Sequence, residues 1–176
     1  MKKLVVVIHP DLNASVFNKR WVEELKKDAD QYYVHELYKS YPDEKIDVAA
    51  EQKLLEQFEE IIFQFPFYWF NCPPLFKKWL DEVLTYGWAF GKKSGYKLKG
   101  KKIALAISIG ISEFEFRENE KYKYTMQELL RPFELTFEYV KADYRPFFPH
   151  YGIELNSSDQ AVEVSVKSYM EYLRQF

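Results

Sequence analysis

Only one cysteine, Cys72, occurs among the 176 residues of the chain. A single thiol cannot form an internal disulfide, and so low a cysteine content is typical of the reducing cytoplasm. An excess of charge of one sign is also absent, because 25 Lys and Arg residues oppose 27 Asp and Glu residues and leave a formal net charge of −2. We therefore expect a cytoplasmic protein that does not bind nucleic acid.

Long hydrophobic runs are absent as well. The longest apolar stretches have the length of strands and fall far short of the roughly 20 residues that cross a bilayer as a helix. The opening stretch MKKLVVVIHP has an apolar core of only five residues, followed by His9 and Pro10, so it is interpreted as a strand and not as a signal segment. We expect no membrane insertion.

Motifs for metal, nucleotide and nucleophile chemistry are also missing. The three histidines, at positions 9, 35 and 150, lack the spacing of metal ligands, and Cys72 has no histidine near it in the sequence. The chain has no G-x-G-x-x-G fingerprint, no P-loop and no G-x-S-x-G. We expect no metal site, and we interpret Cys72 as a packed thiol.

The residues that are present describe a globular α/β protein. Hydrophobic residues make up 47% of the chain, and 176 residues suit one domain with a sizeable core, over residues 1–176. The apolar runs are 4–8, 32–37, 61–65, 103–109 and 144–151, and stretches of helical period lie at 15–28, 49–58, 74–86, 122–140 and 157–176. This alternation predicts a doubly wound, flavodoxin-like, five-stranded parallel sheet of order 2-1-3-4-5, with helices on both faces.

Capping and proline signals mark several helix ends. Asn13 or Ser15 can cap the first helix, and Pro73 and Pro74 fit the first turn of the third. The last helix can be capped by Asn156, Ser157 or Ser158. Pro132 lies inside the fourth helical stretch, so we expect that helix to kink or restart there.

Sheets of this kind bind ligands beyond the carboxyl ends of their strands, near the switch point beside the first strand. That rule selects three loops, at residues 9–18, 66–74 and 108–117. In the first loop, His9, Asn13, Ser15 and Asn18 are polar groups at a helix N-terminus, which favours an anion such as a phosphate. The alternative is structural: Ser15 caps the helix and His9 packs at a strand end.

The second loop is unusually apolar, because it reads FPFYWF before CPP. A flat, stacking aromatic ligand explains such a loop, and so does a hydrophobic staple or an oligomer contact. Consecutive side chains alternate in direction, so the four aromatic residues cannot all point inward. The third loop, SIGISEFEF, offers Ser108, backbone N–H groups and one glycine, which could simply allow a turn.

The segment FQFPFYWFNCPPLFKKWLDEVLTYGWAFG resembles the signature of the flavodoxin-like NAD(P)H:quinone oxidoreductases. The resemblance is to the short bacterial branch, with general stress proteins and the ancillary oxidoreductases of glutathione-gated potassium-efflux systems; DT-diaphorase is a larger relative. HPDLNASVFNKR resembles the phosphate loop of that family, and LLRPFELTFEYVKADYRPFFPHYGI its C-terminal third. The resemblance covers nearly the whole chain.

The resemblance implies a bound flavin, FMN in the short branch and FAD in the larger relatives. It implies a phosphate site at His9, Ser15, Val16, Phe17 and Asn18. It places the isoalloxazine against Pro66, Phe67, Tyr68, Trp69 and Phe70, and closes the far side with Ser108, Ile109, Gly110 and Ile111.

The resemblance also implies a reaction and an assembly. Two electrons pass in a ping-pong cycle from NADPH or NADH through the flavin to a quinone or a similar aromatic acceptor. The family forms homodimers with active sites at the interface, so Trp88 and Phe90 would belong to the aromatic wall of the partner's site. The sequence leaves the nicotinamide and the acceptor open.

The chain departs from the family pattern in two places. The chain reads SIGI where the family often has paired glycines, so Ile109 and Ile111 should narrow the approach to the flavin. Phe116 and Tyr122 stand where DT-diaphorase has a Tyr and a His, and Phe116 cannot donate a hydrogen bond, so that relay is not carried over. Tyr122 and Tyr124 are then the candidate hydroxyl donors, and Phe116 a wall residue.

The sequence leaves three alternatives to this interpretation. The chain could be a regulatory or ancillary subunit of a potassium-efflux or other membrane transport system, in contact with a transporter and with secondary redox activity. A one-electron flavodoxin carrier is disfavoured by the net charge of −2 and by the first loop. A flavodoxin fold that has lost its flavin is the last alternative, because a fold alone does not carry function.

Overall fold

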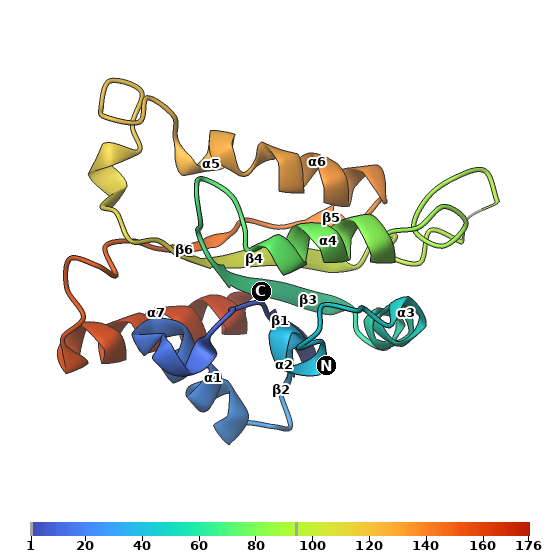
Figure 1. The fold of residues 1–176 in the computed structure, drawn as a ribbon, viewed down its shortest axis with the longest axis horizontal. Helices are drawn as coiled ribbons and strands as arrows, with labels where there is room; N and C mark the ends of the chain where they lie inside the picture. The colour runs from blue at the N-terminus through green and yellow to red at the C-terminus, as the bar shows by residue number, and fades with distance from the viewer. Residues whose placement is uncertain (1, 94) are drawn as a thin grey trace.

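The computed structural model describes residues 2–93 and 95–176, which form a parallel sheet between two layers of helices (Figure 1). The strands are β1 (Lys3–Val7), β2 (Tyr32–Glu36), β3 (Glu60–Pro66), β4 (Lys102–Ser108), β5 (Asp143–Tyr144) and β6 (Phe148–His150). All pairings among them are parallel, in the order β2-β1-β3-β4-β5, with β6 also pairing with β4. The predicted flavodoxin-like topology is therefore confirmed.

The fifth predicted strand, over residues 144–151, is wrong in one respect, because the sheet has two short strands there. Tyr144 pairs with Ile103 and Phe148 pairs with Ala106, so four steps along the edge match three along β4. The edge segment between Tyr144 and Phe148 therefore has one residue more than the matching segment of β4, as in a β-bulge. Pro146 lies in this segment and has no N–H to donate to a β-ladder. The edge is thus interrupted where the sequence pattern was weakest.

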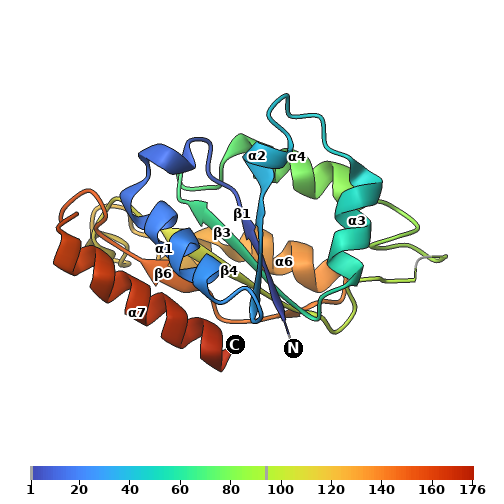
Figure 2. The same ribbon diagram turned by 90° about the horizontal axis from the view of Figure 1, so that it is seen from below.

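The helices cover both faces of the sheet (Figures 1 and 2). They are α1 (Val16–Lys27), α2 (Leu37–Ser40), α3 (Val48–Glu56), α4 (Pro74–Val83), α5 (Met126–Leu129), α6 (Arg131–Tyr139) and α7 (Asp159–Gln175), with 3-10 turns η1 (Leu12–Ala14) and η2 (Glu113–Glu115). Helices α1 and α7 lie on one face, and α4, α5 and α6 lie on the other (Figure 1). The layered arrangement follows from strands that are apolar on both sides.

Local chemistry sets the helix ends. The hydroxyl of Ser15 accepts the N–H of Asn18 at 3.2 Å and caps α1, and Ser158 caps α7 in the same way. The helix predicted over residues 122–140 begins only at Met126, after a capping box of Thr125 and Glu128. It then restarts as α6 with Pro132 in the first turn, as expected for a residue that cannot continue the preceding helix.

Two hydrophobic cores flank the sheet. On one face Phe63 stacks between Phe76 of α4 and Phe137 of α6, at centroid distances of 4.9 and 5.3 Å. On the other face Trp21 of α1 packs on Tyr169 of α7 at 4.9 Å. Each buried aromatic side chain stabilises the fold by about 1.5–3 kcal/mol through burial alone. Residues of β1, β3 and β4 are buried in these cores, and the three loops follow the carboxyl ends of these strands.

In the described ranges, no helix combines the length and the hydropathy that a membrane crossing needs.

Candidate functional site

The three loops meet at the carboxyl edge of the sheet. Pro66 is the register partner of Ser108, and Ser108 is the partner of His150. The Phe67 N–H donates to the Ser108 carbonyl at 2.8 Å, and the Ile109 N–H donates to the His150 carbonyl at 2.8 Å. The second and third loops therefore leave the sheet side by side, and β6 delivers a fourth segment that the sequence analysis did not select.

The first loop leads into a helix N-terminus with backbone N–H groups that have no protein acceptor in the described ranges. Among the described residues, the N–H groups of Val16 and Phe17, at the start of α1, donate to no protein atom. His9 accepts the Asp11 N–H on Nδ1 at 3.2 Å, so its neutral ring carries a proton on Nε2. Burial lowers the pKa of His9 against an opposing effect of Asp11, so the ring is a neutral donor at pH 7.

Asn18 and Ser108, both predicted in contact with the cofactor, have buried side chains that bond to each other. The Asn18 amide donates to the Ser108 hydroxyl at 2.8 Å and to the Ser15 hydroxyl at 3.3 Å. These bonds tie the first loop to the third. Direct contact of the two residues with a cofactor stays a prediction.

The second loop is a strained two-residue turn. Tyr68 and Asn71 exchange backbone hydrogen bonds at 3.0 and 2.9 Å around Trp69 and Phe70. Both central residues have positive φ, 48° and 60°, which Asn-Gly adopts easily and bulky residues do not. Trp69 is 93% exposed, and neither central N–H donates to the protein within the described ranges. Such strain, at about 1–3 kcal/mol per residue, is typical of a binding site.

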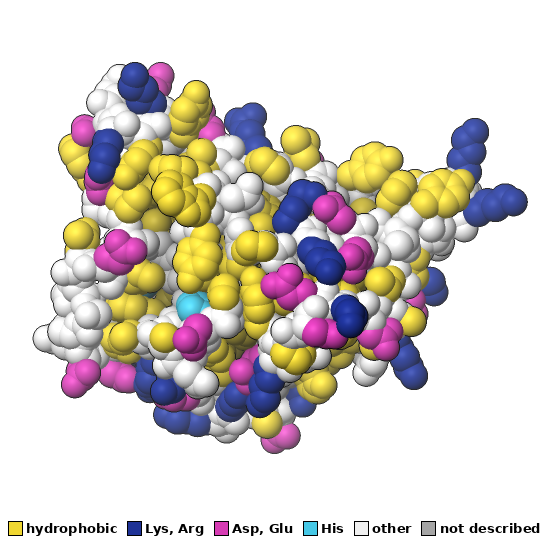
Figure 3. Space-filling view, in the orientation of Figure 1, with side chains coloured by type: hydrophobic (Ala, Val, Ile, Leu, Met, Phe, Trp, Pro, Cys, Tyr) yellow, Lys and Arg dark blue, Asp and Glu magenta, His cyan; other side chains and the backbone are white. Residues whose placement is uncertain are grey.

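An aromatic surface stands beside this turn. We define it by Phe67, Phe70, Tyr122 and Tyr151, which pack around the buried ring of Phe116. Phe116 stacks on Tyr122 at 5.1 Å, Tyr122 lies 5.2 Å from Phe70, and Phe116 lies 6.1 Å from Tyr151. In Figure 3 hydrophobic side chains gather where the second loop and the segment after β4 adjoin. The surface suits a flat aromatic ligand.

The third loop contributes backbone donors. The N–H groups of Gly110 and Ile111 have no acceptor among the described residues. The expectation that both isoleucines narrow the site is wrong for Ile109, which is 1% exposed and points into the core, while Ile111 packs partly against the same core. A Cβ on Gly110 would lie 2.6 Å from Cδ of Glu154, so a neighbouring side chain occupies that space.

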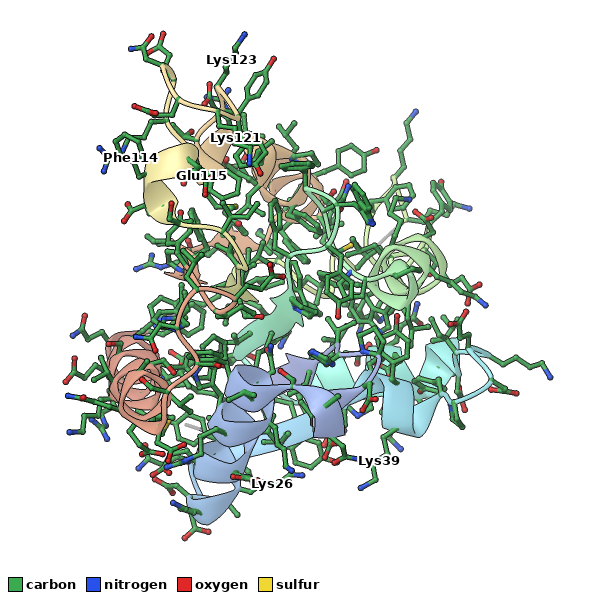
Figure 4. All side chains as sticks on the ribbon, turned by 60° about the vertical axis from the view of Figure 1, so that its left-hand side comes forward. Lys26, Lys39, Phe114, Glu115, Lys121 and Lys123 are labelled. Carbon is green, nitrogen blue, oxygen red and sulfur yellow. The ribbon has the colours of Figure 1, made fainter. Side chains whose placement is uncertain are left out.

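The charged groups near the site are of mixed sign. Figure 4 shows Phe114, Glu115, Lys121 and Lys123 together on the segment after β4, far from Lys26 and Lys39. Lys121 pairs with Glu115 at 3.3 Å, and Lys26 pairs with Glu36 at 2.6 Å. A hollow of about 510 Å³ adjoins the first loop and includes His9, Asp11 and Lys19 in its lining. Binding here therefore depends on placed donors more than on net charge.

Some predicted residues lie away from the loops. Trp88 donates from Nε1 to Glu56 at 2.7 Å, and Phe90 packs 5.5 Å from Tyr139. Phe90 lines a hollow of about 480 Å³ between α4 and α6, outside the three loops. Tyr124 is 59% exposed, whereas Tyr122 is held in the aromatic surface. A role for Trp88 and Phe90 in a partner's site stays a prediction.

Four residues at or near the loops were not predicted from the sequence: Gln64, Tyr151, Glu154 and Tyr169. Gln64 was detectable as the one polar residue inside the apolar stretch IIFQF, and it is fully buried. Tyr151 follows β6, so the strand-end rule would have selected it had that strand been placed. Glu154 and Tyr169 carried no signal, because their contacts with Gly110 and Gln64 arise from chain segments distant in sequence.

Other chemistry has little support. In the described part of the chain no cluster of three or more His, Cys, Asp or Glu side chains could hold a metal. Burial raises the pKa of Cys72 to about 11, so its thiol is protonated and weakly nucleophilic at pH 7. The three loops instead combine a helix N-terminus, an aromatic surface and, in the described ranges, backbone N–H groups without a protein acceptor. That combination fits a ligand with a flat ring, a polar edge and an anionic tail.

Comparison with protein families gives one match over nearly the whole chain. Residues 1–173 match the family described as Flavodoxin_2, flavodoxin-like fold.

Three similar proteins span nearly all of the chain. The protein named Uncharacterized NAD(P)H oxidoreductase YrkL of Bacillus subtilis (strain 168) is 46% identical over 99% of this chain and 98% of its own. The glutathione-regulated potassium-efflux system ancillary protein KefG of Enterobacter sp. (strain 638) is 37% identical over 98% and 92%. The crystal structure of general stress protein 14 from Treponema denticola, in complex with FMN, has a TM-score of 0.93 and 48% identity, with 99% of each chain covered.

Proposed function

The chain belongs to the flavodoxin-like fold family, and on that premise we propose that it is an FMN-dependent NAD(P)H oxidoreductase. The observation that carries the proposal is the convergence of the strained Trp69–Phe70 turn, the unpartnered N–H groups of α1 and the aromatic surface at one sheet edge. The similarity to an FMN complex and to an NAD(P)H oxidoreductase supports it.

The residues of the chain fit FMN in three parts. The phosphate would bind at the start of α1, at His9, Ser15, Val16, Phe17 and Asn18, where N–H groups and a helix N-terminus favour an anion. The ring would lie on Pro66, Phe67, Tyr68, Trp69 and Phe70. Ser108, Ile109, Gly110 and Ile111 would close the far side. FAD remains the alternative cofactor.

When bound at these residues, FMN would supply the hydride chemistry by which two electrons could pass from NADPH or NADH to an acceptor in a ping-pong cycle. The N–H groups of Trp69 and Phe70 are fixed donors for negative charge that develops at the polar edge of the ring. Phe116 holds the ring of Tyr122 by stacking, so the Tyr122 hydroxyl is the better placed of the two candidate donors, and Tyr124 is the second.

The acceptor that suits this site is a small planar aromatic molecule, a quinone or a nitro-aromatic. The aromatic surface offers stacking area and excludes water, while the lysines nearby are partly neutralised by carboxylates. We further propose a cytoplasmic homodimer in which the groove between α4 and α6 adjoins the partner. Trp88 and Phe90 would then complete the partner's aromatic wall.

The visible spectrum of the purified full-length protein tests the proposal. We expect a yellow protein with the visible absorption of a flavin, which NADPH or NADH bleaches and a quinone restores. Identification of the released flavin separates FMN from FAD. A chain that binds no flavin after incubation with FMN, or binds it without oxidising either nicotinamide, would contradict the proposal.

The similarity to KefG favours a second candidate function, an ancillary subunit of a membrane transport system. On this hypothesis the chain binds a transporter and its redox activity is secondary. Co-purification with a transporter encoded beside its gene would support the hypothesis. Full NAD(P)H oxidation activity with no such partner would oppose it.

A further inference from the structure

A chain of buried hydrogen bonds links α7 to the first loop through the centre of the sheet. Tyr169 donates its hydroxyl to Oε1 of Gln64 at 3.1 Å, and Nε2 of Gln64 donates to Oδ1 of Asn18 at 3.2 Å. Gln64, Asn18 and Tyr169 are all at most 1% exposed. A polar network at this depth is costly unless every member is satisfied, so its arrangement is strongly constrained.

One backbone carbonyl, that of Asn18, decides which atoms of this network donate and which accept. The Gln64 amide faces both Oδ1 of Asn18 and the Asn18 main-chain oxygen, the latter at 3.4 Å. A carbonyl oxygen can only accept, so the Gln64 atom beside it must be the NH₂ group. Asn18 must then present its own oxygen to Gln64 and its NH₂ group to the other side.

The orientation of the Asn18 amide decides what Ser15 can do. The Asn18 NH₂ group and the Asn18 main-chain N–H both donate to the Ser15 hydroxyl, at 3.3 and 3.2 Å. A hydroxyl has two acceptor sites and one donor, so both acceptor sites of Ser15 are occupied. Its proton has no acceptor among the described residues, and the side chain is only half-buried at the start of α1.

We propose that Gln64 is a positioning residue for the anion site: by fixing the orientation of the Asn18 amide, it makes the Ser15 hydroxyl a hydrogen-bond donor toward the phosphate of the cofactor. The proposal rests on the proposed function, because the phosphate is that of FMN. It assigns a role to a buried glutamine that touches neither the cofactor nor the reacting atoms.

The test is the preference of the full-length chain for FMN over riboflavin, which lacks the phosphate, measured by fluorescence titration after removal of bound flavin. Ser15→Ala removes the donor, and Gln64→Met keeps the length of the side chain but releases the Asn18 amide. We expect each to lower the preference about tenfold, as the loss of one hydrogen bond to a charged group does. In the Ser15→Ala background, Gln64→Met should lower it no further.

Tyr169→Phe is the matched control. It removes a buried bond from the same network, but the Asn18 carbonyl still sets the direction of Gln64. Its melting temperature should therefore fall while its FMN preference is unchanged. If Gln64→Met does not fold, Gln64→Leu makes the same test with a shorter apolar side chain that also releases the Asn18 amide.

Three results would overturn the inference. Ser15→Ala could retain the full FMN preference, Gln64→Met could weaken FMN and riboflavin equally, or the two losses could add in the double variant. A wild-type chain that binds FMN no more tightly than riboflavin is a different outcome. Equal affinity for FMN and riboflavin would contradict the phosphate site, and with it the proposed function. Failure of the Gln64 proposal is thereby distinguished from failure of the proposed function.

Discussion

The Nε2 atom of His35 lies 2.8 Å from Oε1 of Glu51, a carboxylate buried on the α3 face of the sheet. Tyr41 and Trp79 donate to the same carboxylate, each at 2.8 Å. Burial alone would raise the pKa of Glu51, but the hydrogen bonds and charge of His35 and the bonds from Trp79 and Tyr41 together lower it. Glu51 is thus an ionised carboxylate that joins β2, α3 and α4 away from the three loops.

The first prediction concerns the pH dependence of stability. A carboxyl group whose pKa is lowered by folding stabilises the protein above its unfolded pKa, about 4.3, and this stabilisation is lost as the pH falls through the folded value. Glu51→Gln should lower the free energy of unfolding at pH 7 by about 2 kcal/mol or more, because the buried donors lose their partner. The difference from wild type should shrink as the pH falls below about 4.3, toward the lowered pKa of the folded state.

Chemical denaturation at several pH values measures this difference. Glu118→Gln is the control, since Glu118 is an exposed carboxyl on the segment after η2. It should leave both the free energy of unfolding and its pH dependence close to wild type. A Glu51→Gln penalty that stays constant from pH 6 to pH 3 would show that the charge of Glu51 is not what stabilises the fold.

The second prediction is that Trp69→Ala weakens flavin binding much more than it weakens the fold. Trp69 is nearly fully exposed, so its removal should change the free energy of unfolding by less than about 0.5 kcal/mol. Loss of a stacking ring should weaken FMN by about tenfold. Isothermal titration of flavin-free protein gives the affinity. Tyr33→Ala, at an exposed aromatic residue on β2, is the control and should keep wild-type affinity.

The third prediction concerns the two tyrosines after η2. Tyr122→Phe should lower kcat/KM for a quinone acceptor about tenfold, because the stacked ring places its hydroxyl at the aromatic surface. Tyr124→Phe should have a smaller effect, since Tyr124 is largely exposed. Steady-state kinetics with both variants shows which tyrosine contributes more to kcat/KM. Equal activity of wild type and both variants would remove the tyrosines as donors and leave the backbone N–H groups.

The fourth prediction tests the homodimer. Leu135 and Tyr139 on α6 line the groove with Phe90, and Leu135 is 65% exposed. Leu135→Asp should shift the protein toward monomer, because it places a charge in an apolar contact. Sedimentation velocity measures the proportion of monomer and dimer. Val164→Asp, at an exposed residue of α7, is the control. If the Leu135→Asp protein sediments as a dimer, the groove is not the interface.

Much of the fold was readable from local pattern. The apolar runs at residues 4–8, 61–65 and 103–109 coincide with the three central strands, because a strand buried on both faces is apolar throughout. Ser15, Ser158 and Pro132 marked helix boundaries through local hydrogen-bonding chemistry, which needs no tertiary contact. The edge was less predictable, since β5 and β6 are too short for a periodic signal and depend on pairing with β4.

The sequence by itself indicated the strands, the helices and the apolar loop, because strand burial, helix period and capping are properties of neighbouring residues. The sheet order followed from the topology that alternating strands and helices favour. Tertiary structure alone decided that Ile109 turns into the core, that Phe116 stacks on Tyr122, and that Gln64 bonds to Asn18. Each of these contacts joins segments whose distance depends on how helices and strands pack. The proposed orientation of the Ser15 hydroxyl depends on Gln64, 49 positions away, which no local pattern can specify.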